Sequence, residues 1–173
     1  ISKIFTINNY HRNLLRYKDV NQEINIYNNY VDLNKEKPKP SFGFKNKICF
    51  VGRFSKEKNI ELLLESFQSF IRTTKRNFHL FVIGDGRYKI NVRKVKNDNI
   101  TFTGKLTHTE LKSYLLECDY LVLPSYTEGL PFTIIEAMNM GVPCIYSNIN
   151  GAPEIITENR TGFLFNFSGY ENV

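Results

Sequence analysis

The stretch that decides the fold is KICFVGRFSKEKNIELLLESF, residues 47–67. It opens with the apolar run KICFV, which stops at Gly52, and a short polar loop follows. Asn59 then stands where a helix N-cap is expected, and apolar residues recur at helical spacing at Ile60, Leu63, Leu64, Phe67, Phe70 and Ile71. A buried strand that leads through a loop into an amphipathic helix is the repeating unit of a parallel sheet.

The same alternation continues to residue 147. Four more short apolar runs end in Gly, Ser or a polar loop, namely FHLFVIG, NITFTG, DYLVLPS and VPCIYS. One intervening helix begins with a capping box, Thr107 and Glu110; another has Pro131 in its first turn and stops at Gly141; a weaker, basic one covers residues 87–96. The pattern predicts an α/β fold, a Rossmann-like doubly wound parallel sheet flanked by helices.

Residues 1–46 do not follow this rhythm. The segment from His11 to Lys18 predicts a helix, and EINIYNNYVD, residues 23–32, predicts a strand. KEKPKPSFGFKNK follows, and its proline and lysine content is typical of a linker. We therefore expect a first part over residues 1–46 and a Rossmann-like domain over residues 47–173.

Charge is distributed unevenly along the 173 residues. The net charge is +6, but residues 1–100 hold 20 Lys and Arg against 9 Asp and Glu, hence +11, and residues 101–173 hold 3 against 8, hence −5. A basic half suits nucleic acid, an anionic membrane or a phosphorylated small molecule, and it also suits a solvated face around a neutral site. Without a membrane-spanning run or a signal peptide, a cytoplasmic location is expected.

Cysteine and histidine do not form a recognisable site in the sequence. Cys49, Cys118 and Cys144 lie far apart among apolar neighbours, so we expect reduced cysteines in the core. His79 begins a predicted strand and is expected to be a core residue, whereas His108 falls at a helix start and is expected to be solvated.

Two cations follow the strand at residues 47–52. Arg53 and Lys58 flank a loop that leads to a helix N-terminus, where unpaired N–H groups and the helix dipole attract anions. A diphosphate would satisfy both cations with charge-assisted contacts of roughly 1.5–3 kcal/mol each. In the alternative interpretation, the neighbouring Glu57 neutralises them.

Two carboxylates follow the strand DYLVLPS. Glu128 lies in the loop beside Gly129, and Glu136 lies in the next helix among residues expected to be buried. Carboxylates suit the vicinal hydroxyls of ribose and hexoses, because each oxygen accepts one hydroxyl hydrogen. A pair of carboxylates also suits general acid and base catalysis, as in glycoside hydrolysis, but the cationic loop favours a phosphorylated ligand.

The glycines of GDGR, residues 84–87, predict a tight turn whose amides lie near the ligand. A lone GxG is weak evidence for dinucleotide binding, because the GxGxxG pattern is not completed. No DxD, HExxH or GxxxxGK motif occurs, so no metal is expected.

From Lys47 to Phe165 the chain resembles the retaining glycosyltransferases of family 4 (group 1), which have the two-domain GT-B fold. The stretches that carry the resemblance are FVGRFSKEKNIELLLESF, VIGDGR, ITFTGKL, LVLPSYTEGLPFTIIEAMNMGVPCI and GAPEIITENRTGFLF. Arg53-x4-Lys58 matches the family's Arg-x4-Lys signature, and Glu128-x7-Glu136 matches its paired glutamates. The domain at residues 47–173 would then be the C-terminal, nucleotide-sugar-binding half of a GT-B fold.

The resemblance implies a role for each matched position. Arg53 and Lys58 would hold the donor diphosphate, Glu128 would contact the donor sugar, and these three would be the catalytic residues. Glu136 would bind the ribose hydroxyls. The remaining donor-binding positions would be Gly52, Gly84, Gly129, Leu130 and Pro131 around the phosphate and sugar, and Lys105 and Leu106 beside the nucleobase. No cofactor is implied; the donor substrate would be a nucleotide-diphosphate sugar, with a UDP-sugar expected.

The family also implies parts that this sequence lacks. Its members need an N-terminal domain that binds the acceptor, and residues 1–33 look like the last helix and strand of such a domain. The end at GYENV precedes the family's usual terminal helices, so an excised fragment, inactive alone, is expected. Asn150 replaces a usual glycine, which matters little if the turn still closes.

The family resemblance implies sugar transfer with retention, in polysaccharide or glycolipid assembly. The basic half adds the expectation of peripheral contact with an anionic membrane at its inner face, and no nucleic acid partner is expected. Two alternatives differ in class: a GT-B-fold nucleotide-sugar epimerase, and a non-catalytic basic module that binds nucleotide or nucleic acid. The combined Arg-x4-Lys and Glu-x7-Glu pattern disfavours both.

Overall fold

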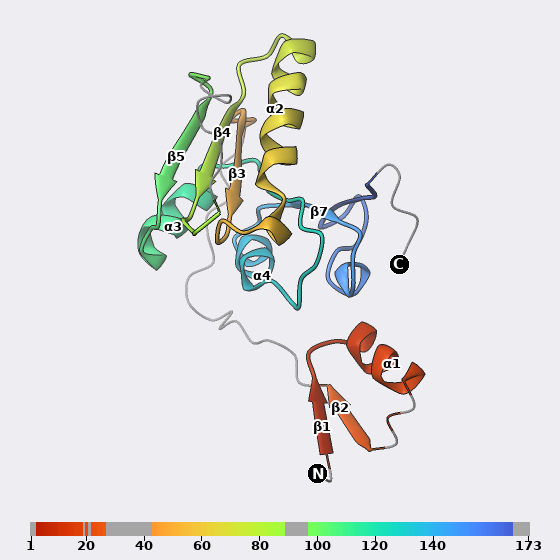
Figure 1. The fold of residues 1–173 in the computed structure, drawn as a ribbon. Helices are drawn as coiled ribbons and strands as arrows, with labels where there is room; N and C mark the ends of the chain where they lie inside the picture. Colours follow the sequence, from red (N-terminus) through yellow and green to blue (C-terminus); the bar gives the residue numbers. More distant parts are fainter. Residues whose placement is uncertain (1–2, 19, 21, 27–42, 89–96, 168–173) are drawn as a thin grey trace.

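The computed structural model describes residues 3–18, 20, 22–26, 43–88 and 97–167, and they form two separate parallel sheets (Figure 1). The small sheet pairs β1 with β2, and the large sheet has six strands. The strands are β1 (Lys3–Thr6), β2 (Glu23–Ile26), β3 (Lys47–Val51), β4 (His79–Ile83), β5 (Ile100–Gly104), β6 (Tyr120–Leu123), β7 (Cys144–Ser147) and β8 (Gly162–Phe165).

The large sheet has the strand order β5-β4-β3-β6-β7-β8, and all neighbouring strands are parallel. Counted from β3, this is the order 3-2-1-4-5-6 of a doubly wound Rossmann sheet. The predicted fold class is therefore confirmed. The direction of winding reverses between β3 and β6, and this pair marks the edge where such folds bind ligands.

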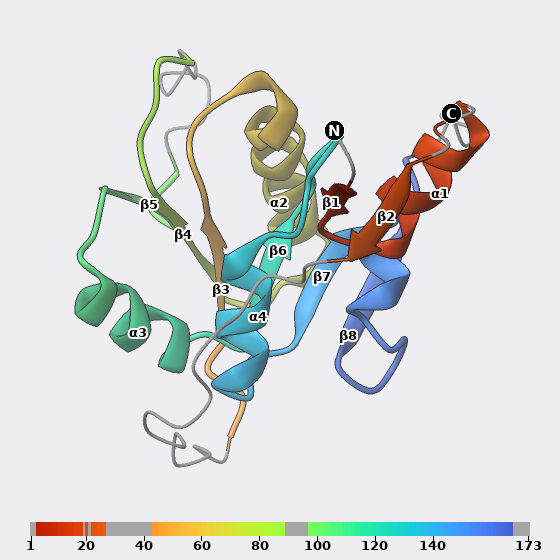
Figure 2. The same ribbon diagram turned by 90° about the horizontal axis from the view of Figure 1, so that it is seen from below.

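Helices cover both faces of the large sheet. They are the 3-10 turn η1 (Lys56–Lys58), α2 (Ile60–Thr74), α3 (His108–Leu116), α4 (Phe132–Asn139) and the 3-10 turn η3 (Ala152–Glu154). Right-handed crossovers require that connections running in opposite directions across the sheet lie on opposite faces. Accordingly α2 lies on one face, and α3 and α4 lie on the other (Figures 1 and 2).

Helix starts agree with the sequence in part. The capping box of α3 is present, with Thr107 and Glu110 each accepting a hydrogen bond from the other's backbone N–H. Asn59 precedes α2 as predicted, but its side chain makes no capping bond because the residue adopts a left-handed conformation (φ 50°) at the end of η1. Pro131 is the N-cap of α4 rather than a residue of its first turn, and Gly141 (φ 74°) follows the helix end.

The segment before residue 47 contains the predicted helix and part of the predicted strand. α1 (Asn9–Tyr17) joins β1 to β2, and β1 is a strand that sequence analysis did not identify. Residues 27–42 lie outside the described part, as does most of the predicted basic helix at 87–96; the described residues 87–88 are not helical. The division of the chain at residue 46 stays a prediction.

The core lies between the large sheet and its helices. Its largest fully buried side chains come from the strands and from α2, α3 and α4, and include Phe50, Ile60, Leu64, Leu80, Leu115, Leu121, Ile134 and Tyr146. The apolar face predicted for α2 is confirmed, with Ile60, Leu63, Leu64 and Phe67 buried. Within the described residues, no helix is long and apolar enough to cross a membrane.

The three cysteines are buried and free, as predicted, and we expect them to be unreactive in the folded protein. Burial raises the pKa of Cys144 to about 12, and the contact with Cys118 together with burial raises the pKa of Cys49. Because the thiolate is the reactive form, a disulfide reagent at pH 8 should label no thiol in the native protein and all three after unfolding in urea. Rapid labelling of the native protein would contradict this packing.

Candidate functional site

The candidate site lies where β3 and β6 end side by side, at the reversal of the sheet order. The loop after β3 carries Arg53 and Lys58, and the loop after β6 carries Glu128. The two loops are joined through the main chain, since Tyr126 N–H donates to the carbonyl of Glu57 at 2.8 Å. The topology thus brings together residues that are 70 positions apart in the sequence.

Lys58 and Glu128 form an ion pair within this site. The Lys58 ammonium donates to Oε1 of Glu128, and the side chains are 21% and 10% exposed. Oε1 also accepts a hydrogen bond from Ser125 Oγ at 2.7 Å, and the buried Ser147 hydroxyl holds the Ser125 carbonyl at 2.6 Å. Glu128 is therefore fixed by a cation and a hydroxyl on a rigid strand end, and burial together with the charge of Glu128 raises the pKa of Tyr146.

The carboxylate that pairs with Lys58 is Glu128 and not the neighbouring Glu57 of the alternative interpretation. The Glu57 side chain is exposed. The pKa of Glu57 is lowered, and the largest cause is a hydrogen bond from the Ser55 side chain. A hydrogen bond from the backbone of Glu57 itself lowers the pKa further, and the charges of Arg53 and Lys58 lower it by less.

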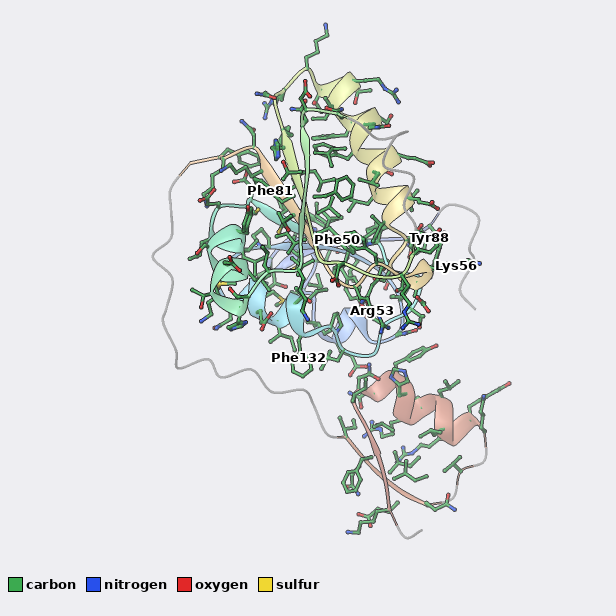
Figure 3. The ribbon with its side chains drawn as sticks, turned by 60° about the vertical axis from the view of Figure 1, so that its left-hand side comes forward. Phe50, Arg53, Lys56, Phe81, Tyr88 and Phe132 are labelled. Carbon is green, nitrogen blue, oxygen red and sulfur yellow. The ribbon has the colours of Figure 1, made fainter. Side chains whose placement is uncertain are left out.

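Arg53 is exposed, and it makes no hydrogen bond or ion pair with any residue that the structure describes. Figure 3 places Arg53 and Phe132 at the edge of the large-sheet domain that faces α1, whereas Phe50 lies inside the domain. A guanidinium in this position retains its five donors for an anion at the same edge as Lys58.

Glu136 projects from α4, half-buried, near the start of α3. Its neighbours Ile134 and Ala137 are buried as predicted, but Ile135 and Met138 are only partly so. Oε1 lies 3.7 Å from Nδ1 of His108, and the side chains of Glu136 and His108 are 24% and 63% exposed. His108 is solvated as predicted, but sequence analysis missed its nearness to Glu136. Its position, just after the expected base-binding residues, was the available signal.

Gly52 and Gly84 lie where the ends of β3 and β4 approach each other closely. Gly52 N–H donates to the Ile83 carbonyl at 3.0 Å, and Gly84 N–H donates to the Gly104 carbonyl at 2.9 Å. Both amides are therefore engaged in the sheet. A Cβ on Gly84 would lie 2.0 Å from the carbonyl oxygen of Gly52, so glycine permits this close approach. Their assignment as donor-binding positions stays a prediction.

The remaining predicted donor positions follow the ends of β5 and β6. Lys105 is exposed and Leu106 packs partly against the core directly after β5. In the loop after β6, Gly129 is exposed, Leu130 is half-buried and Pro131 is buried. Their contacts with a donor stay a prediction.

Asn150 does close the turn after β7. It adopts a left-handed conformation (φ 45°), which asparagine tolerates better than most residues. Its side-chain amide donates to Oγ1 of Thr127 at 3.2 Å and to the carbonyl of Glu128. The departure from the expected glycine therefore adds two contacts to the loop that carries Glu128.

The described residues contain no group of three or more His, Cys, Asp and Glu side chains that could hold a metal ion. The positive charges at the candidate site are those of the Arg53 and Lys58 side chains. That the chemistry needs no metal stays a prediction.

The fold and this site define a Rossmann-like domain of the kind found in GT-B glycosyltransferases. Residues 32–172 match the family model of glycosyl transferases group 1, and the chain belongs to this family. A curated relative, the UDP-Gal:alpha-D-GlcNAc-diphosphoundecaprenol alpha-1,3-galactosyltransferase of Escherichia coli, is 30% identical over 166 residues, which cover 87% of this chain and 43% of that enzyme. The chain spans less than half of the length of the curated relatives it matches.

Solved structures share the fold over almost the whole chain. A mutant of S. aureus TarM, crystallised with alpha-GlcNAc-glycerol, UDP and fondaparinux, matches with a TM-score of 0.84 at 21% identity over 98% of this chain and 34% of its own. Anabaena HepE in complex with UDP-glucose matches with a TM-score of 0.74 at 16% identity over 95% of this chain and 50% of its own. The similarity includes the segment before the large sheet.

Proposed function

We propose that this chain is the donor-binding half of a retaining glycosyltransferase of family 4, and that it binds a nucleotide-diphosphate sugar at the ends of β3 and β6. The observation that carries the proposal is the Lys58–Glu128 pair at the reversal of the sheet, with Arg53 exposed in the same loop as Lys58 and without a hydrogen bond or ion pair to the described residues. An ammonium and a guanidinium at one strand end suit a diphosphate, and the adjacent carboxylates suit sugar hydroxyls.

Arg53 and Lys58 act on the leaving group in this proposal. Cleavage of the bond between the sugar and the diphosphate leaves an oxocarbenium-like sugar and moves negative charge onto the departing phosphate oxygens. Positive charge fixed at the place where negative charge develops lowers the barrier. Glu128, held by Ser125 and Lys58, orients the donor sugar, and Glu136 binds the ribose hydroxyls.

We propose a UDP-sugar as donor and an acceptor from polysaccharide or glycolipid assembly. TarM and HepE are described with UDP and UDP-glucose, and the E. coli relative is named for a UDP-galactose donor and a lipid-diphosphate acceptor. The acceptor domain, retention, the cytoplasmic location and peripheral contact with an anionic membrane belong to the same proposal. They rest on the family resemblance and on the uneven charge of the sequence.

Calorimetric titration of this chain with UDP, GDP and ADP tests the proposal. We expect saturable binding of one diphosphate, and about a 10-fold loss of affinity in Glu136→Gln, because a neutral amide accepts fewer ribose hydroxyls than a carboxylate. Glu65→Gln, the same charge change on the exposed face of α2, is the matched control and should bind as the wild type does.

Two results would contradict the proposal. No saturable binding of any of the three diphosphates would remove its basis. Equal loss in Glu136→Gln and Glu65→Gln would show that only the net charge matters, and affinity that falls steeply with salt for every nucleotide would then favour a non-catalytic basic module. The match to a glycosyltransferase family model disfavours that module and the epimerase.

A further inference from the structure

The β1–α1–β2 unit, residues 3–18, 20 and 22–26, contacts the large-sheet domain through the N-terminus of α1. Oε2 of Glu154 accepts hydrogen bonds from Asn9 N–H at 3.0 Å and from the Asn9 side-chain amide at 2.7 Å. Oε1 accepts one from Tyr10 N–H at 3.0 Å. Glu154 belongs to η3 in the large-sheet domain, 144 and 145 positions away in the sequence.

These bonds contribute to the capping of α1. A helix leaves its first four backbone N–H groups without partners inside the helix. In α1 the Asn8 side chain accepts a hydrogen bond from the N–H of His11, and the Asn8 carbonyl accepts the first bond within the helix, from the N–H of Arg12. The first two N–H groups are satisfied by Glu154, from outside the unit. A carboxylate in this position also meets the positive end of the helix dipole.

The unit has little apolar core with which to fix its own position. α1 has no buried residue, and Phe5, Leu14 and Tyr17 are exposed among the described residues. Its buried side chains are polar, Thr6 and Asn8. The placement of the unit against the large-sheet domain therefore depends on directed polar contacts, with Glu154 contributing three of them.

A second set of contacts joins the unit to the loop that carries Glu128. The side-chain amide of Asn8 donates to the Gly129 carbonyl at 3.3 Å, and a Cβ on Gly129 would lie 2.7 Å from the Ile7 side chain. A Cβ on Gly151 would lie 2.6 Å from the same Asn8 amide. Gly151 lies between η3 and Asn150, whose side chain holds the Glu128 carbonyl. Figure 2 shows α1 beside the segment that leads into β8.

We propose that Glu154 is a positioning residue that docks the β1–α1–β2 unit onto the loop at residues 127–129 and so holds Glu128 in its donor-binding position. The inference rests on the proposed function for the role of Glu128 and deepens it. Residues 3–26 then act on the donor side of the reaction, because they support the loop that presents a carboxylate to the sugar. Donor binding and docking of the unit stabilise each other, as linkage requires.

Hydrogen exchange of this chain in Glu154→Gln tests the docking. The introduced side-chain amide can accept at one atom only, so the Asn9 or the Tyr10 N–H group loses its acceptor and should exchange about 10-fold faster, and protection of residues 126–131 should fall with it. Glu158→Gln is the matched control, because Glu158 also accepts a backbone N–H, that of Leu164 at 2.8 Å, but within the β8 segment. Peptides of β3, β4 and α2 should be unchanged in both variants.

A second variant separates docking from its effect on the loop. Asn8→Ser keeps a residue that caps α1 but removes the amide that reaches Gly129. We expect the Asn9 and Tyr10 amides to keep their protection in this variant, while residues 126–131 lose theirs. Unchanged exchange of α1 in Glu154→Gln, or unchanged exchange of the loop in both variants, would overturn the proposal.

The coupling to the donor is tested by adding UDP in the same experiment. UDP should slow the exchange of the Asn9 and Tyr10 amides in the wild type by several-fold and should have less effect in Glu154→Gln. Binding of UDP with no change at α1 would overturn the coupling. Failure of the wild type to bind any of UDP, GDP and ADP would count against the proposed function, while the exchange measured without nucleotide would still decide the docking.

Discussion

Lys58→Ala should weaken binding of the cognate nucleoside diphosphate by about 10- to 100-fold, because it removes a charge-assisted contact to phosphate. In a form of the enzyme that transfers sugar, turnover should fall by about 10²- to 10³-fold, since the same cation faces the charge that develops on the leaving group. Calorimetry on this chain measures the first effect. Lys56→Ala, an exposed lysine of the same 3-10 turn, is the matched control and should change affinity little.

The ion pair with Glu128 offers a competing explanation for such a loss. Glu128 is nine-tenths buried in the structure, and without Lys58 it would keep the Ser125 hydroxyl but have no cation beside it, so the loop could shift for that reason alone. The double variant Lys58→Ala/Glu128→Gln separates the two explanations, because it removes the uncompensated charge as well as the ammonium. UDP lacks the transferable donor sugar that Glu128 would bind, so affinity for UDP should remain low in the double variant if Lys58 binds phosphate.

Recovery of affinity in the double variant would show that Lys58 serves only to neutralise Glu128. The single variant Glu128→Gln completes the double-mutant cycle formed by the wild type, Lys58→Ala and the double variant. It should bind UDP at least as tightly as the wild type, because the Lys58 ammonium is then released from its carboxylate partner. A large loss in Glu128→Gln alone would contradict the assignment of Glu128 to the sugar.

Much of the large sheet could be predicted because each element has its own local signal. The runs before Gly52 and Gly84 are apolar and end in glycine, and the capping box at Thr107 and Glu110 marks a helix start without reference to the rest of the fold. β8, Gly162–Phe165, was missed because only three apolar residues follow Gly162 and no helical periodicity precedes them to mark the alternation of helix and strand. Asn59 was predicted to cap with its side chain, but the preceding 3-10 turn imposes a left-handed backbone there.

The candidate site was only partly predictable, since its contacts cross long stretches of sequence. The residue types at positions 53, 58, 128 and 136 indicated phosphate and hydroxyl binding. Which carboxylate meets Lys58 depends on the pairing of β3 with β6, and the only carboxylate that the local sequence offered was Glu57, in the alternative interpretation. The contact between Glu154 and α1 and that between His108 and Glu136 join separate elements in the same way. No local pattern predicts the first, and the only signal for the second was the position of His108 just after Lys105 and Leu106.

The second large effect is expected for Gly84→Ala, at the point where the ends of β3 and β4 meet. A Cβ there would lie 2.0 Å from the Gly52 carbonyl oxygen, an atom of the sheet backbone that cannot rotate away. The backbone also has φ 129°, which is a region that residues other than glycine rarely adopt. Strain of roughly 1–3 kcal/mol from each source should lower the free energy of unfolding by about 2–6 kcal/mol in urea denaturation.

Gly141→Ala separates the two sources of strain in Gly84→Ala. Gly141 also has a positive φ, 74°, but a Cβ there would meet nothing within 4 Å, so the variant should lose only about 1 kcal/mol. Equal losses in the two variants would show that the strand ends can separate at no cost. A larger loss in Gly84→Ala, accompanied by weaker binding of the diphosphate, is expected, because Gly52 begins the loop that carries Arg53 and Lys58 and the clash must move that loop.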